Sequence, residues 1–97
     1  MSTLKEFKAK LEAIKPILRE RYKVETIGIF GSYSRGEQTR RSDIDILVTF
    51  SESIGLYRFI EVQEFIRKKL GVKVDLVQKG ALLPLMKDQI LNEIVQV

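Results

Sequence analysis

Two short apolar segments, residues 24–30 and 44–50, leave this chain few ways to fold. Each is bounded by polar residues or glycine, and each has the length of a buried strand rather than that of a helix. On either side of this pair, over residues 3–22 and 56–70, apolar residues recur at the three- and four-residue steps of an amphipathic helix. The pattern therefore predicts two strands that are covered by helices.

The rest of the chain adds one strand, one helix and a short last segment. Residues 72–77 alternate in a way that is typical of a third strand, and Gly71 suits the end of the helix before it. Pro84 suits the first turn of a last helix, and residues 94–97 are predicted to form a short edge strand. This order of elements predicts an α/β or α+β fold, with a small mixed sheet of three or four strands flanked by helices.

The first helix and the first strand each carry local signals. Ser2 or Thr3 can cap the helix, and Glu6 completes a capping box with Thr3. Pro16 removes one helical hydrogen bond, so we expect a kink or two abutting helices near this residue. Gly28, within the first strand, marks a point where another backbone or a ligand can approach closely.

The composition is that of an ordinary globular domain. The 97 residues are 44% apolar and 31% charged, and no run reaches the roughly 18 apolar residues that a membrane helix needs. The first residues form a charged amphipathic pattern rather than a secretory signal, so we expect a cytoplasmic protein with no membrane partner. We predict one domain over residues 1–97, with little room for a second substrate-binding module.

The chain contains neither cysteine nor histidine. Disulfides, zinc fingers, thiol nucleophiles and histidine-based acid–base catalysis are therefore excluded. Any metal must be held by oxygen ligands, which favours magnesium, manganese or calcium. The net charge of +4 suits an anionic ligand, but it is weaker than the charge of a dedicated nucleic-acid binder, so a nucleic-acid partner is not favoured.

Three aspartates are placed to share one site. Asp43 and Asp45 point the same way along a strand, about 7 Å apart, and Asp75 would join them if the strands 44–50 and 72–77 are neighbours. Two carboxylates about 4 Å apart repel by roughly 4 kcal/mol at an effective dielectric of 20, so three together need a cation or a proton. Two divalent metals about 3.5–4 Å apart are the arrangement that activates an attacking oxygen and stabilises a leaving phosphate.

A glycine–serine turn lies between the two apolar segments. A strand that ends at Gly31 and enters a helical turn presents backbone N–H groups, which bind phosphate oxygens well. The Ser32 hydroxyl adds a donor, and Arg35 can offer its guanidinium to a triphosphate. The sequence thus indicates a site for a metal-bound polyphosphate.

Each of these features also has a plainer interpretation. Ser42 and Asp43 could simply form a turn, and Asp75 could pair with Lys73 or Arg35. The glycine–serine segment could be a tight turn with a surface arginine. The residues alone leave both interpretations open.

Taken together, the motifs resemble those of the minimal nucleotidyltransferase family, within the polymerase β superfamily. The resemblance extends from about Val24 to the end of the chain, and its combination of motifs is highly specific. It implies a polymerase β-like fold, ATP or another nucleoside triphosphate as donor, and two Mg²⁺ ions. The stretches that carry it are Gly31-Ser32-x-x-Arg35-Gly36, Ser42-Asp43-x-Asp45 and Val74-Asp75-Leu76-Val77.

The resemblance also implies a role for each site residue. Asp43 and Asp45 would hold both metals, and Asp75 would hold the catalytic one and help the acceptor hydroxyl lose its proton. A nucleoside monophosphate would pass to a hydroxyl group, and pyrophosphate would be released. Gly31 and Ser32 would bind the β- and γ-phosphates. Arg35 would neutralise phosphate charge, and Ser42 would orient the turn.

The acceptor is less constrained than the donor. The resemblance suggests a small helical HEPN protein as partner in a toxin–antitoxin pair, with this chain as the antitoxin that adenylylates a partner tyrosine. The alternatives are an antitoxin that acts by contact alone, and transfer to a small molecule or an RNA end. Candidate contact surfaces are the basic run 67–69 and the apolar tail residues Leu82, Leu83, Leu85 and Met86.

Overall fold

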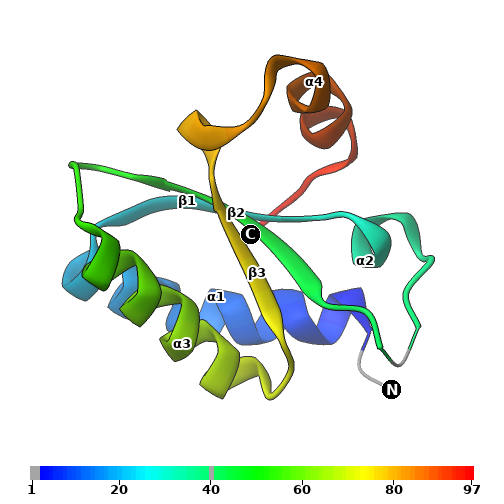
Figure 1. Ribbon diagram of the computed structural model, residues 1–97. Coiled ribbons are helices and arrows are strands. Elements are labelled where there is room, and N and C mark those ends of the chain that lie inside the picture. Colours follow the sequence, from blue (N-terminus) through cyan, green and yellow to red (C-terminus); the bar gives the residue numbers. More distant parts are fainter. Residues whose placement is uncertain (1–2, 40) are drawn as a thin grey trace.

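The structure, a computed structural model, describes residues 3–39 and 41–97. Helices and strands follow one another in the predicted order, with one short 3-10 helix, η1, that the sequence did not predict (Figure 1). The elements are α1 (Leu4–Tyr22), β1 (Val24–Phe30), α2 (Ser32–Arg35), β2 (Ile44–Phe50), α3 (Leu56–Leu70), β3 (Val74–Gln78), η1 (Lys79–Ala81), α4 (Pro84–Glu93) and β4 (Val95–Gln96).

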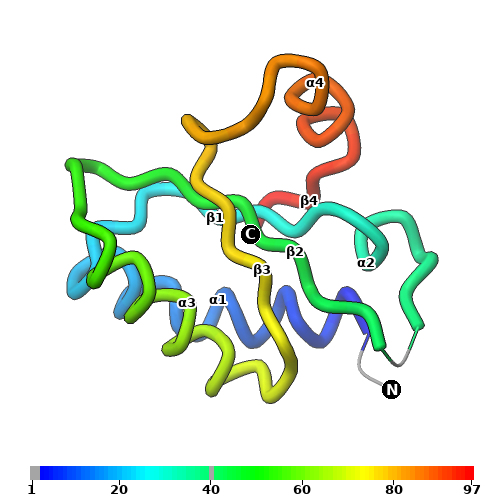
Figure 2. Tube along the Cα trace, in the orientation of Figure 1, coloured from blue at the N-terminus to red at the C-terminus, as the bar shows by residue number. Residues whose placement is uncertain are grey.

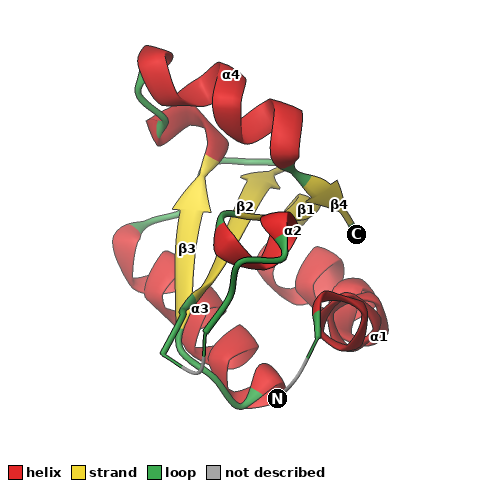
Figure 3. Ribbon diagram, turned by 90° about the vertical axis from the view of Figure 1, so that its right-hand side faces the viewer, coloured by secondary structure: helices red, strands yellow, loops and turns green. Residues whose placement is uncertain are grey.

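The strands form one mixed sheet in the order β3-β2-β1-β4. Strand β2 runs parallel to β3 and antiparallel to β1, and β4 returns antiparallel to the other side of β1 (Figures 2 and 3). The parallel pair is possible because α3 carries the chain back between β2 and β3. The predicted small mixed sheet with flanking helices is confirmed.

The sheet lies between two unequal helical layers. Helices α1 and α3 cover one face and form the main core, whereas α4 lies on the other face over a smaller cluster (Figure 1). Alternation along β2 assigns its side chains to these faces: Ile44 and Ile46 enter the main core, and Leu47 packs under α4 with Phe30 and Ile90. Side chains two residues from Leu47 therefore also point toward α4.

Helix α1 shows one confirmed signal and one wrong expectation. Thr3 caps the helix, because its Oγ1 accepts a hydrogen bond from the Glu6 N–H at 3.2 Å; the alternative cap, Ser2, lies outside the described residues. The expected pair of abutting helices is wrong, since α1 continues through Pro16 as one element. Pro16 and Glu12 are both exposed residues, so they lie on the side of the helix where water can replace the hydrogen bond that Glu12 loses.

The C-terminal half follows the sequence prediction with small shifts. Gly71 ends α3 in the left-handed conformation, with φ of 73°, and β3 begins two residues later than expected because the chain turns at this point. The predicted last helix begins at Pro84, and the predicted edge strand forms as β4. Within the described part of the chain, no helix combines the length and the apolarity needed to cross a membrane.

Gly28 is a point of close approach, as its position in the first strand predicts. Its backbone pairs with Gln96 of β4. A Cβ atom at Gly28 would lie 2.3 Å from Cδ1 of Ile94, the residue that follows α4. The missing side chain therefore lets the end of α4 rest directly on the sheet.

Candidate functional site

A pocket of about 540 Å³ opens between the sheet and α4. On the sheet side it is lined by five of the seven predicted site residues, and on the helix side by side chains that include Met86, Gln89, Ile90 and Glu93. The other two predicted residues, Ser42 and Asp43, do not line the pocket. The five that do are Gly31, Ser32, Arg35, Asp45 and Asp75.

Asp45 and Asp75 lie side by side across the parallel strands β2 and β3. Their Cα atoms are register partners, so the alternation that points Asp45 toward the α4 side also points Asp75 there. Burial and, after it, the neighbouring carboxylates of Asp75 and Asp43 together raise the pKa of Asp45 to about 6, whereas the positive charge of Arg35 opposes this rise. The structure thus concentrates negative charge on one face of the sheet.

Asp43 and Ser42 lie in the segment that leads into β2. Asp43 is exposed, but it is close enough for its charge to raise the pKa of Asp45. The Ser42 Oγ accepts a hydrogen bond from the Thr39 N–H at 2.9 Å, and the Ser42 N–H donates to the Thr39 carbonyl at 3.1 Å. Ser42 therefore shapes the turn that presents Asp43.

The glycine–serine turn follows β1 and faces the acids. Gly31 has φ of 76° and ψ of −150°, a conformation that L side chains rarely adopt. A Cβ atom there would lie 2.0 Å from Oδ2 of Asp45, so any side chain at this position would displace this carboxylate. Ser32, half-buried, opens α2 directly after it. The turn and the acids are in contact, as the sequence prediction of a shared site requires.

Arg35 is held by two carboxylates. Its Nη1 donates to both oxygens of Glu93, at 3.0 and 3.2 Å, and its Nε donates to Glu37. The hydrogen bond to Glu37 and, to a smaller extent, the hydrogen bond to Glu93 raise the pKa of Arg35. The alternative pairing of Arg35 with Asp75 is not among the ion pairs of the described residues.

Glu93 is a site residue that sequence reasoning missed. Its Oε1 also accepts a hydrogen bond from the Gly31 N–H at 3.1 Å, so one carboxylate contacts both the turn and the arginine. The signal in the sequence is weak: an acid at the last position of a helix is disfavoured by the helix dipole and so needs a partner elsewhere. Nothing in the local pattern says that the partner is Arg35.

The acids of this pocket fit a divalent cation, although they do not surround one as placed. Within residues 3–39 and 41–97, no three His, Cys, Asp or Glu side chains lie close enough together to hold a metal ion. Asp45 and Asp75 are adjacent, and the exposed Asp43 would have to turn toward them. A cation between these carboxylates would relieve the repulsion that contributes to the raised pKa of Asp45, and carboxylate oxygens are ligands that Mg²⁺ prefers.

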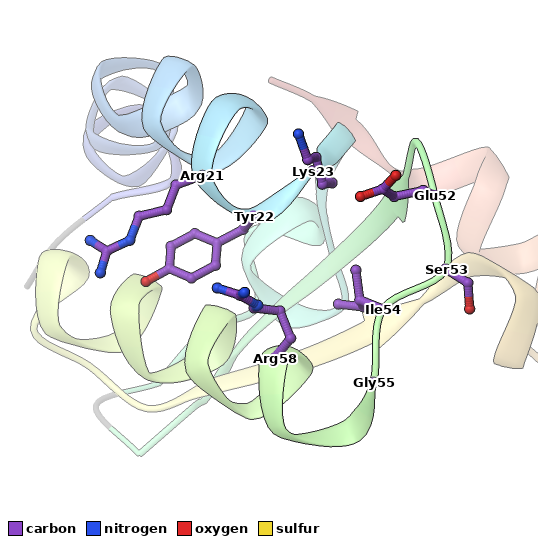
Figure 4. Close-up of a pocket in the computed structure, with 8 residues that line it drawn as sticks. All are labelled: Arg21, Tyr22, Lys23, Glu52, Ser53, Ile54, Gly55 and Arg58. Carbon is purple, nitrogen blue, oxygen red and sulfur yellow. The ribbon is translucent and has the colours of Figure 1, made fainter.

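A second pocket, of about 260 Å³, has a different character (Figure 4). Its side chains come from the end of α1, the loop after β2 and the first turn of α3. It presents the cations of Arg21, Lys23 and Arg58 with one carboxylate, that of Glu52. None of the predicted site residues lines it, so the acids and the glycine–serine turn define the candidate site.

Known proteins resemble this chain in sequence and in fold. A family model described as a nucleotidyltransferase domain matches residues 11–97. The protein adenylyltransferase MntA of Thermococcus cleftensis is 47% identical over 97 residues, which cover 100% of this chain and 98% of that protein.

Solved structures extend the likeness to three dimensions. A structure described as that of a minimal nucleotidyltransferase is 31% identical, with a TM-score of 0.85 over 99% of this chain and 97% of that one. A complex of a tri-AMPylated Shewanella oneidensis HEPN toxin with its MNT antitoxin contains a chain that is 25% identical, with a TM-score of 0.68 over 93% of this chain and 70% of that one. The family match spans most of the sequence and the relative from Thermococcus cleftensis matches all of it, and so the chain belongs to the nucleotidyltransferase domain family.

Proposed function

We propose that this chain transfers AMP from ATP to a hydroxyl group of a protein partner, with Mg²⁺ as cofactor and pyrophosphate as the second product. The observation that carries the proposal is the adjacency of Asp45 and Asp75 beside the Gly31–Ser32 turn, within one pocket. The relative from Thermococcus cleftensis, a protein adenylyltransferase, supports AMP as the group that is transferred.

The residues of the pocket divide into an acidic side and a phosphate side. Asp45 and Asp75, joined by Asp43 after rotation, would hold the cations. The Gly31–Ser32 turn would hold the β- and γ-phosphates, with the Ser32 hydroxyl as donor, because the Gly31 N–H donates to Glu93 and Gly31 contributes the close approach of its bare backbone. Bound Mg²⁺ would activate the attacking oxygen and stabilise the leaving pyrophosphate.

Asp75 and Arg35 have further roles in the proposed reaction. Asp75 is exposed on the edge strand β3, where an acceptor can approach, and its carboxylate would help the acceptor hydroxyl lose its proton. Arg35 would neutralise phosphate charge as the triphosphate binds and pyrophosphate leaves.

The partner we propose is a HEPN-type protein, by likeness to the complex from Shewanella oneidensis. An apolar surface for such a partner lies at the rim of the pocket, where Leu83, Leu85 and Met86 have 65%, 95% and 49% of their surfaces exposed. Leu83 and Met86 also line the pocket, so a protein bound there would lie beside the acids. By contrast, Leu82 packs into the small cluster under α4, and Arg67 of the basic run pairs with Glu64.

The experiment is a transfer assay with ATP labelled at the α-phosphate, Mg²⁺ and a lysate of the source cells to which a HEPN-type protein has been added. Label on the partner protein is the expected result, and label at the γ-position should not be transferred. Binding of the two proteins without any transfer of label would instead support an antitoxin that acts by contact alone. Label on RNA or on a metabolite in the same mixture would show that this molecule, and not a protein, is the acceptor.

A further inference from the structure

We propose that Glu93 is a positioning residue that aims the guanidinium of Arg35 at the phosphates of the bound nucleotide. This inference rests on the proposed function, because it assumes a triphosphate in the pocket between the sheet and α4. Glu93 itself would not touch the reacting atoms. It would act through Arg35 and through the Gly31 peptide, both of which its carboxylate contacts.

The first argument is the way in which the guanidinium is held. Its Nε donates to Glu37 and its Nη1 donates to both oxygens of Glu93. Among the residues that the structure describes, no hydrogen bond or ion pair engages Nη2 of Arg35. Two carboxylates therefore fix the plane of a flexible side chain and leave one nitrogen free, on a residue that lines the pocket.

The second argument is the environment of the Glu93 carboxylate. Its side chain is only 16% exposed, compared with 62% for that of Glu37, so water screens its interaction with Arg35 much less. A second hydrogen bond, from the Gly31 N–H, fixes its position. Glu93 thus sets the distance between the arginine and the turn that would hold the β- and γ-phosphates.

The third argument is that α4 does not need this charge in order to pack. Ile90 is the buried residue of the helix, and it joins Phe30 and Leu47 in the small cluster on the sheet. A carboxylate at the last position of α4 opposes the helix dipole, so on its own account the helix end would be better without it. The negative charge of Glu93 is therefore explained by its ion pair with Arg35, and not by any stabilisation of α4.

The test measures equilibrium binding of AMP-PNP with Mg²⁺ by calorimetry, which needs neither an acceptor nor turnover. Glu93→Gln keeps an oxygen for the Gly31 N–H and removes the charge that orients Arg35. We expect its affinity for the nucleotide to fall about tenfold, the size of one lost charge-assisted hydrogen bond. Asp88→Asn, which removes the same charge from an exposed residue of the same helix, should leave the affinity unchanged.

A double-mutant cycle separates positioning from a general structural role. In the Arg35→Ala background, which already binds more weakly, Glu93→Gln should have no further effect on affinity. Circular dichroism and the Tm monitor folding, and Glu93→Asp, which withdraws the carboxylate by one methylene, serves as the second variant if Glu93→Gln does not fold.

Three results would overturn the inference while leaving the proposed function intact. The first is an unchanged nucleotide affinity in Glu93→Gln. The second is tighter binding in that variant, which would make the carboxylate a competitor of the phosphates. The third is that Glu93→Gln lowers the affinity equally in the wild-type protein and in the Arg35→Ala background. A wild-type protein that binds no Mg²⁺–AMP-PNP would instead reject the proposed function itself, and with it the inference.

Discussion

Asp45 and Asp75 are register partners on the parallel strands β2 and β3, and both point toward the side of the sheet that α4 covers. Helix α3 brings the second acid level with the first, so two residues far apart in the sequence become neighbours. Burial and this adjacency together raise the pKa of Asp45, and in our proposal the adjacency creates the binding site for the metal. The first two predictions follow from it.

Replacing Asp45 with asparagine should stabilise the metal-free protein at neutral pH. The pKa of Asp45 is raised from 3.8 to about 6, so its contribution favours folding below about pH 4 and is lost as the pH rises through 6. After a discount for the partial exposure of this group, we expect a gain of about 1 kcal/mol at pH 7.5, which is about 4–8 °C in Tm. Thermal unfolding in EDTA checks this, and the difference between variant and wild type should vanish toward pH 4.

Nucleotide binding should depend on metal and on pH together. A metal ligand must be deprotonated, so Mg²⁺ has to displace the proton that Asp45 holds below about pH 6. We expect the affinity for Mg²⁺–AMP-PNP to fall by about tenfold for each pH unit below 6, the dependence of a single proton. Calorimetry between pH 5 and 8 measures this. In Asp45→Asn any residual binding should lack this dependence, and equal binding in EDTA would contradict the proposed metal site.

Gly31→Ala should impair the site far more than Gly36→Ala does. Both glycines have positive φ, 76° and 72°, so both substitutions strain the backbone by about 1–2 kcal/mol. A Cβ atom at Gly31 would also collide with Asp45 Oδ2 at 2.0 Å, whereas nothing lies within 4 Å of one at Gly36. The Gly36→Ala variant should therefore keep the wild-type affinity for the nucleotide and show a slightly lower Tm. The Gly31→Ala variant should show a marked fall in both nucleotide affinity and Tm.

Asp43→Asn and Asp45→Asn should each reduce AMP transfer at least a thousandfold with the fold intact, if both carboxylates hold the metals. The transfer assay with labelled ATP measures the rate, and circular dichroism measures the fold. Asp88→Asn on α4 is the matched control and should transfer at the wild-type rate. Wild-type transfer in Asp43→Asn would remove Asp43 from the metal site.

Much of the fold could be predicted because local patterns decide it. The alternation along 44–50 sets which residues share a face. The cap at Thr3 begins α1 by a local hydrogen bond, and the left-handed turn at Gly71 ends α3. The motifs could be placed at one sheet face for the same reason. What the alternation could not supply is the strand order, on which the meeting of Asp45 and Asp75 depends.

The residues that sequence reasoning misjudged depend on the tertiary arrangement. The contact between Glu93 and Arg35 exists because α4 crosses back over the sheet. The apolar pattern within α4 does not indicate which residue of the sheet or its loops the end of the helix will contact. Pro16 was expected to kink α1 or divide it into two abutting helices. The division is wrong, because Pro16 lies on the exposed side of one continuous helix, where water can reach the carbonyl that the proline leaves without a partner. In both cases the surroundings of the residue, rather than its neighbours in sequence, decided the outcome.

The bare backbone at Gly28 sets how deeply the C-terminal segment sits. Ile94 occupies the space that a side chain at Gly28 would fill, and Ile94 directly follows Glu93. A single methyl group in the middle of β1 would displace the Ile94 side chain, directly beside the residue whose carboxylate contacts the turn. A substitution at Gly28, which does not line the pocket, could thus change the affinity of the site for its substrate.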